Sequence, residues 1–211
     1  LESGLSIAAL VFLLSTSSIP GDHNFLTQKN YSLLNRNKNI QINTVFADNI
    51  LLTLAYMRGI VQKGHPISWD AVRAPFSYGF VLQPGETFAF HDSVSDKYRK
   101  SLKQTTNAHF IADEGFKSDG WLVGDGVCHL ASFLKVAAED AGLEVDVPSN
   151  HNFATIADIP KADGVSIYYT PKSELTSSLH NLYITDSVSQ PIAFLFEYNN
   201  SLLTISVTKI P

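Results

Sequence analysis

The sequence predicts an α+β fold in which a mostly antiparallel sheet packs against a central helix that begins at a cysteine. Helix-like and strand-like patterns do not alternate regularly, as they would in a doubly wound α/β fold. Successive apolar segments at 181–185, 191–198 and 202–208 are typical of neighbouring antiparallel strands, with Asn199-Asn200 predicted as a type I′ hairpin turn. The longest helical pattern outside the N-terminal half starts at Cys128.

The elements before the cysteine are predicted in chain order. Residues 46–62 carry apolar side chains at helical spacing and are followed by Gly64 and Pro66, which favours an amphipathic helix. Residues 80–82 and 87–90 are predicted as short strands on either side of a turn at 83–86. The polar stretch 92–106 is expected to be helical at its start.

The elements after the cysteine complete the domain. The helix at 128–141 is expected to end at Gly142, a natural C-cap. Residues 143–147 are predicted as a strand, 148–152 as a polar loop, and 165–169 as another strand.

The N-terminal region differs in composition from the rest. Residues 5–14 form an apolar run that is too short to span a bilayer and resembles the core of a signal peptide, or a clipped membrane anchor. No basic segment precedes the run, which counts against a signal peptide, and a buried first helix is the alternative because apolar runs of this length are ambiguous. We therefore expect residues 1–19 to be a truncated signal peptide or anchor, 20–45 an asparagine-rich linker, and 46–211 the domain. Export, with possible anchoring through this end, gives an extracytoplasmic location.

Composition excludes several functional classes. The chain has 211 residues, 45% hydrophobic and 17% charged, which is ordinary for a folded domain. Its net charge of −5, without a Lys/Arg cluster, argues against a nucleic-acid partner. One cysteine excludes an internal disulfide and a multi-cysteine zinc site, and no short histidine pair is present. We expect no metal, no cofactor and a monomer.

Cys128 is the main candidate for chemistry. It follows the turn Gly124-Asp125-Gly126-Val127 and enters the first turn of its helix, where free backbone N–H groups and the helix dipole favour a thiolate. The alternative is a buried structural cysteine, the commoner role. Helical spacing places Cys128 with Ser132, Lys135 and Glu139, opposite the apolar face, so the thiol is expected to face a polar cleft.

A cysteine nucleophile needs a base, and histidine is the usual one. His129 points about 100° away from its neighbour along a helix and is a poor partner. His151 is the preferred base because the chain has turned back towards the cysteine helix at that point. Asp163 and Asp186 are candidates to orient the imidazole, although each suits a turn or a strand end equally well. His91, His109 and His180 cannot be ranked from the sequence.

Several segments together resemble the VanW-like family of bacterial cell-envelope proteins. Gly124-Asp125-Gly126-Val127-Cys128-His129 is similar to the family's Gly-Gly-Gly-Val-Cys-Gln, and residues 141–145 to its Ala-Gly-Leu-Glu-Ile. Residues 84–90 resemble Pro-Gly-Glu-x-Phe-Ser-Phe, and residues 115–117 resemble Gly-Tyr-Lys. Downstream, His151 falls on the second histidine of an Arg-His-x-His-Ser element, while Asp163 and residues 181–186 match later segments. The similarity spans about residues 46–208. It departs from the family at Asp125, at His129 and at the first histidine of the paired element.

The resemblance implies an activity on peptidoglycan stem peptides, since some VanW domains are understood to be cysteine L,D-transpeptidases. Cys128 would attack the carbonyl before the terminal D-alanine, and His151 would take the thiol proton. The expected substrate-binding residues are Gly124, Asp125, Gly126, His129 and Lys117. A non-catalytic module that binds cell-wall peptides, linked to glycopeptide resistance, and a cysteine peptidase or amidase are the alternatives.

Overall fold

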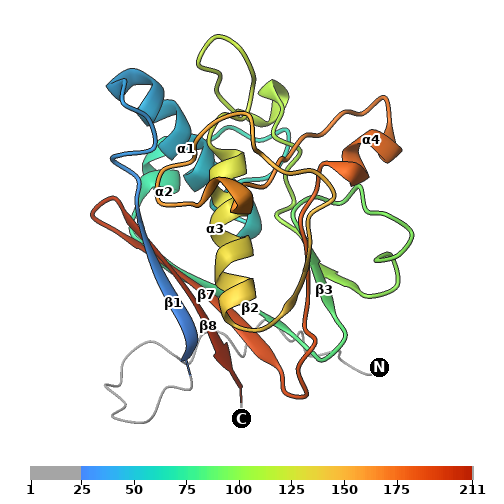
Figure 1. Ribbon diagram of the computed structural model, residues 1–211. Coiled ribbons are helices and arrows are strands. Elements are labelled where there is room, and N and C mark those ends of the chain that lie inside the picture. The colour runs from blue at the N-terminus through green and yellow to red at the C-terminus, as the bar shows by residue number, and fades with distance from the viewer. Residues whose placement is uncertain (1–24, 211) are drawn as a thin grey trace, which may run out of the picture.

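The computed structural model describes residues 25–210, which fold around one buried helix, α3 (Val127–Asp140) (Figure 1). The predicted α+β class and the mostly antiparallel pairing are confirmed. The expectation of a signal peptide or anchor at residues 1–19 lies outside the described residues. Within residues 25–210, no helix combines the length and the apolar character needed to cross a membrane.

Two sheets lie on either side of α3, where the sequence had predicted one. The first has the order β1-β8-β7-β2 and is antiparallel throughout. The second has the order β4-β3-β6-β5, and only β3 and β4 run parallel. The strands of the first sheet are β1 (Phe25–Ser32), β2 (Phe76–Leu82), β7 (Ile192–Asn199) and β8 (Leu202–Lys209). Those of the second are β3 (Thr87–Ala89), β4 (Leu102–Gln104), β5 (Glu144–Asp146) and β6 (Tyr183–Thr185).

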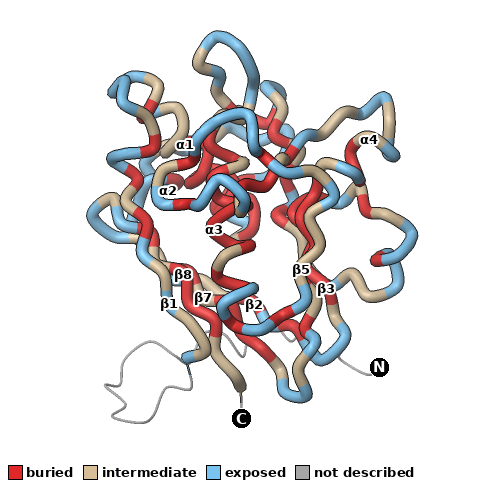
Figure 2. Tube along the Cα trace, viewed as in Figure 1, coloured by how far each residue is buried: buried red, intermediate tan, exposed pale blue. Residues whose placement is uncertain are grey.

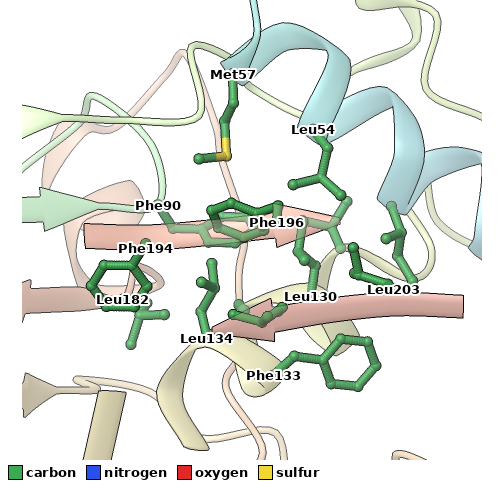
Figure 3. Packing of buried hydrophobic residues seen from close by; sticks show 14 of the residues in the cluster. Leu54, Met57, Phe90, Leu130, Phe133, Leu134, Leu182, Phe194, Phe196 and Leu203 are labelled. Atoms are coloured by element: carbon green, nitrogen blue, oxygen red, sulfur yellow. The ribbon is translucent and has the colours of Figure 1, made fainter. Parts of the chain in front are cut away.

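Residues 25–210 form further helices, of which α1 and η4 contact α3. They are α1 (Ile40–Met57), α2 (Trp69–Arg73), α4 (Glu174–Leu179) and the short 3₁₀ turns η3 (Ala112–Glu114) and η4 (Lys161–Asp163). Figure 2 shows that burial concentrates along α3 and the strands that flank it, whereas the surrounding loops are exposed. In the core, Leu54 and Met57 of α1, Leu130 and Leu134 of α3, and aromatic residues of the first sheet pack together (Figure 3).

The linker expected at 20–45 is wrong for the residues that the structure describes. β1 pairs with β8 along its length, and Tyr31 stacks on Phe133 of α3 with ring centroids 3.8 Å apart. Helix α1 begins at Ile40 because the Asn39 side chain accepts hydrogen bonds from Gln41 N and Ile42 N, a regular N-cap. The domain therefore includes residues 25–45.

Two local predictions also fail. The stretch 92–106 forms turns and β4 in place of a helix, with Tyr98 stacked on Tyr183 at 4.2 Å. Residues 165–169 run extended but carry only an isolated bridge, between Asn150 and Val165, so they are not a strand. The hairpin between β7 and β8 turns one residue later than predicted, with positive φ at Asn200 and Ser201.

Candidate functional site

The turn before α3 packs against α1, which also holds it through hydrogen bonds. Gly124 and Gly126 have φ of 90° and 96°, and a Cβ on Gly126 would lie 2.5 Å from the Phe46 carbonyl oxygen. The buried side chain of Asn49 donates to the carbonyls of Lys117 and Asp125 at 2.9 and 2.8 Å and accepts from Lys117 N at 2.9 Å. Asn49 is not among the predicted site residues, although an amide inside an apolar helical run is itself a signal of a specific hydrogen-bonding role.

Cys128 enters the first turn of α3, as predicted, but its thiol does not face an open polar cleft. Its Sγ donates to Ile167 O at 3.7 Å and accepts from Ile167 N at 3.4 Å, so the extended segment 165–167 covers it. The residue is half-buried overall, yet its sulfur is enclosed by protein atoms, and the sulfur's surroundings govern ionisation. Burial, reinforced by the negative charge of Asp125, raises the pKa of the Cys128 thiol to about 11.

This result corrects the expectation of a thiolate. The free N–H groups and the dipole at the start of α3 favour the anion. Enclosure of the sulfur opposes it, because a buried charge loses its hydration. Since the pKa rises, desolvation is the larger effect, and Cys128 is a neutral thiol at physiological pH.

The polar face of α3 is likewise covered by the segment 163–167. Ser132 Oγ donates to Cys128 O at 2.7 Å and accepts from Val165 N at 2.9 Å. One turn further on, Lys135 Nζ contacts Asp163 Oδ1 at 2.8 Å and Glu139 Oε2 at 2.6 Å. The predicted alignment of these residues with Cys128 is thus observed, but their side chains bind the segment 163–167 to the helix.

His151 does not contact Cys128 among the hydrogen bonds of residues 25–210. Its backbone N–H donates to Gly164 O at 2.8 Å, its ring packs against Phe153, and its buried Nδ1 has no hydrogen-bonding partner. Burial lowers the pKa of His151. His129 lies edge-on to Phe46 at 5.1 Å and is also neutral, since burial and the charge of Arg36 lower its pKa to about 3.

Neither aspartate orients an imidazole in the structure of residues 25–210. Asp163 is paired with Lys135, as described above. Asp186 lies at the end of β6, where its Oδ1 accepts from Val188 N at 3.0 Å and its backbone pairs with Gly85 and Glu86. Burial raises the pKa of Asp186. The two residues stabilise local turns and strand ends, the alternative that sequence analysis had left open.

Lys117 belongs to a charged cluster around Asp48 of α1. Its Nζ contacts Asp48 Oδ2 at 2.5 Å and lies 3.8 Å from the ring centroid of Trp69. Arg73 donates to the same carboxylate through Nε and Nη2, at 2.9 and 2.8 Å. Although burial opposes ionisation, the hydrogen bonds from Arg73 and Lys117 lower the pKa of Asp48. Lys117 is therefore committed to an internal ion pair.

A histidine that the sequence could not rank lies between two carboxylates. His109 Nδ1 lies 2.7 Å from Glu114 Oε1, and its Nε2 lies 3.0 Å from Asp92 Oδ1. Its ring packs on Tyr169, with centroids 4.3 Å apart. Hydrogen bonds to Asp92 and Glu114 raise the pKa of His109 to about 9, so it is an imidazolium at neutral pH.

Two hollows lie away from Cys128. A hollow of about 450 Å³ is lined by Pro75, Phe76 and residues 197–199, and another of about 250 Å³ by residues around Arg99 and Glu174. Among residues 25–210, no cluster of histidine, cysteine and acidic side chains is arranged to hold a metal ion.

The chain matches no protein-family model, no curated protein and no solved structure.

Proposed function

We propose that this chain is a VanW-like cell-envelope domain that binds peptidoglycan stem peptides without turning them over. The resemblance across about residues 46–208 supports the substrate class. The state of Cys128 supports binding over catalysis: its thiol is hydrogen-bonded to the Ile167 backbone, its pKa is about 11, and no imidazole is bonded to it within residues 25–210. A nucleophilic cysteine needs an accessible sulfur, a lowered pKa and a base within hydrogen-bonding distance.

The neutral, enclosed thiol is the single observation on which this choice depends. In the proposed domain, Cys128 works as a structural residue that fastens the segment 165–167 to α3. The two glycines of the preceding turn then serve packing, because the Gly126 position leaves no room for a side chain beside Phe46.

Sedimentation with purified peptidoglycan tests the proposal. The protein should co-sediment with intact sacculi and fail to do so with sacculi from which an amidase has removed the stem peptides. Because the thiol is assigned no role in binding, Cys128→Ala should bind as the wild type does. Equal binding to both sacculus preparations, or to neither, would contradict the proposed function.

A cysteine acyltransferase of the L,D-transpeptidase type is the second candidate, and the position of Cys128 in the first turn of α3 favours it. For this reaction the segment 165–167 must leave the sulfur and His151 must reach it. The Cys128 thiolate would then attack the carbonyl before the terminal D-alanine. D-alanine would leave with a proton, and an amine of a second stem would displace the thiol to form the cross-link.

Product analysis separates the two candidates. Incubation with purified muropeptides should leave them unchanged if the domain only binds. Appearance of 3–3 cross-linked dimers that Cys128→Ala cannot form would establish the acyltransferase, whereas shortened monomers alone would identify a peptidase.

A further inference from the structure

Three buried side chains beside the start of α3 carry nitrogen atoms without hydrogen-bonding partners. They are Arg36 Nε, His129 Nδ1 and His151 Nδ1. The residues are 4%, 5% and 9% exposed and come from three separate segments: the turn after β1, the first turn of α3, and the loop after β5. Buried polar atoms in proteins are nearly always paired, so these three nitrogen atoms are groups that a bound molecule could satisfy.

The three side chains belong to one neighbourhood. The Arg36 guanidinium lies 5.2 Å from the centroid of the Phe133 ring, and the His129 ring lies 6.4 Å from the same centroid. The loop that carries His151 reaches both elements. The His151 backbone N–H donates to Gly164 O, and the next residue, Val165, donates its N–H to Ser132 Oγ of α3. Further along this loop, Ala157 O accepts a hydrogen bond from Arg36 Nη1.

The chemistry of these atoms selects the ligand. An arginine Nε always carries a proton and can only donate, and a neutral imidazole protonated at Nδ1 donates there as well. The fixed positive charge of Arg36 disfavours a metal cation. A carboxylate suits the group best, because its two oxygens offer several acceptor positions and its charge pairs with the guanidinium.

Arg36 already has one carboxylate partner, and that partner is on the solvent side. Asp158 forms an ion pair with Arg36 Nη2, while Arg36 Nη1 donates to Ala157 O at 3.0 Å. The Asp158 side chain is 47% exposed, whereas that of Arg36 is 0% exposed. Asp158 also has a φ of 68°, a left-handed conformation that is unfavourable for a residue with a side chain.

We propose that Arg36, His129 and His151 form a binding site for a carboxylate group, and that Asp158 occupies the arginine until a ligand carboxylate displaces it. The site does not involve the sulfur of Cys128. The site deepens the proposed function, because stem peptides end in a free carboxylate that this site would recognise. Only the choice of D-alanine as the ligand rests on the proposed function.

The test uses the whole protein labelled with ¹⁵N-histidine and N-acetyl-D-alanine as the probe. The imidazole signals of His129 and His151 should shift saturably, and those of His65 and His180 should not. Asp158→Asn should tighten binding several-fold, because the competing carboxylate is removed. His129→Phe retains the ring that packs against Phe46 and should weaken binding about tenfold.

The controls distinguish this site from a general effect of charge. Arg99→Gln removes an exposed arginine that pairs with Asp96 and Glu174 and should leave binding unchanged. No saturable shift in the wild type, or equal affinity in wild type, Asp158→Asn and His129→Phe, would overturn the site. Sacculus binding without binding of the probe would refute the site and leave the proposed function standing. Equal affinity for N-acetyl-L-alanine would retain the site and argue against stem peptides.

Discussion

At the scale of single residues, Cys128 illustrates a competition that a sequence cannot decide. Its position at a helix start was predictable from the glycine turn and the apolar pattern, and this position favours a thiolate. What covers the sulfur is Ile167, which lies 39 residues further along the chain. Only the folded structure shows that desolvation of the sulfur has the larger effect.

Alkylation of Cys128 by iodoacetamide should therefore be slow. With a pKa of about 11, the thiol has far less thiolate at about pH 6.5 than an ordinary cysteine, and the rate should be roughly 100-fold below that of a small free thiol. Mass spectrometry of timed samples gives the rate, and the same reaction in denaturant provides the reference. Labelling in the native protein that is as fast as in the unfolded chain would show that the sulfur is neither neutral nor enclosed.

Ser132→Ala should expose the same thiol. The change leaves the buried Val165 N–H without its acceptor, at a cost of about 1–3 kcal/mol, and loosens the segment that covers the sulfur. Denaturant unfolding should report the lost stability, and alkylation at pH 8 should accelerate several-fold. Ser178→Ala, which removes a buried serine that donates only to Leu175 O, is the matched control. Identical alkylation rates for the two variants would show that Ser132 does not hold the cover in place.

At the scale of elements, success and failure in prediction have physical causes. Helix α3 was predictable because its ends are marked: Gly126 precedes it, and Gly142 closes it with hydrogen bonds from Gly142 N to Glu139 O and from Leu143 N to Ala138 O. Strand β1 was missed because it is an edge strand in which Tyr31 is the buried residue, so its sequence lacks a clear apolar alternation. Asn39, taken as part of a linker, is the N-cap of α1.

Gly126→Ala should be more damaging than Gly142→Ala. Both glycines have positive φ, but only at Gly126 would a Cβ meet backbone, that of Phe46 at 2.5 Å. We expect a loss of about 3 kcal/mol in the free energy of unfolding at Gly126 and about 1 kcal/mol at Gly142. Urea unfolding measures both, and similar losses would mean that α1 and the turn are not held in close contact.

At the scale of the whole molecule, separated segments are held together by a few charged groups. His109 joins Asp92, beyond β3, to Glu114 in η3, and Tyr169 packs on its ring. Lys63 approaches Glu114 at 4.0 Å, and the buried, neutral His91 lies nearby with a pKa lowered by burial to about 4. Glu114 is close to His109 in the chain, but the contacts with Asp92 and Tyr169 do not follow from sequence patterns, which explains why His109 could not be ranked.

Stability should fall with rising pH through the titration of His109. Its pKa is about 6.5 when unfolded and about 9 when folded, so its contribution is complete below about 6.5 and is lost as the pH rises through 9. The loss should be about 2 kcal/mol after allowance for the exposure of Asp92. Unfolding measured between pH 6 and 9.5 should show this decline in the wild type and a flatter profile in His109→Gln. Parallel profiles for the two proteins would contradict the assignment.

The pairing of β1 with β8 has a consequence for synthesis in the cell. Among the described residues, β1 is the first strand in the chain and its partner β8 is the last, so one side of the support for α3 is missing until β8 has left the ribosome. Contacts between such distant parts of a chain form slowly. The nascent domain carries exposed apolar surface until that pairing is made, and chaperone binding should be strongest just before the hairpin of β7 and β8 emerges.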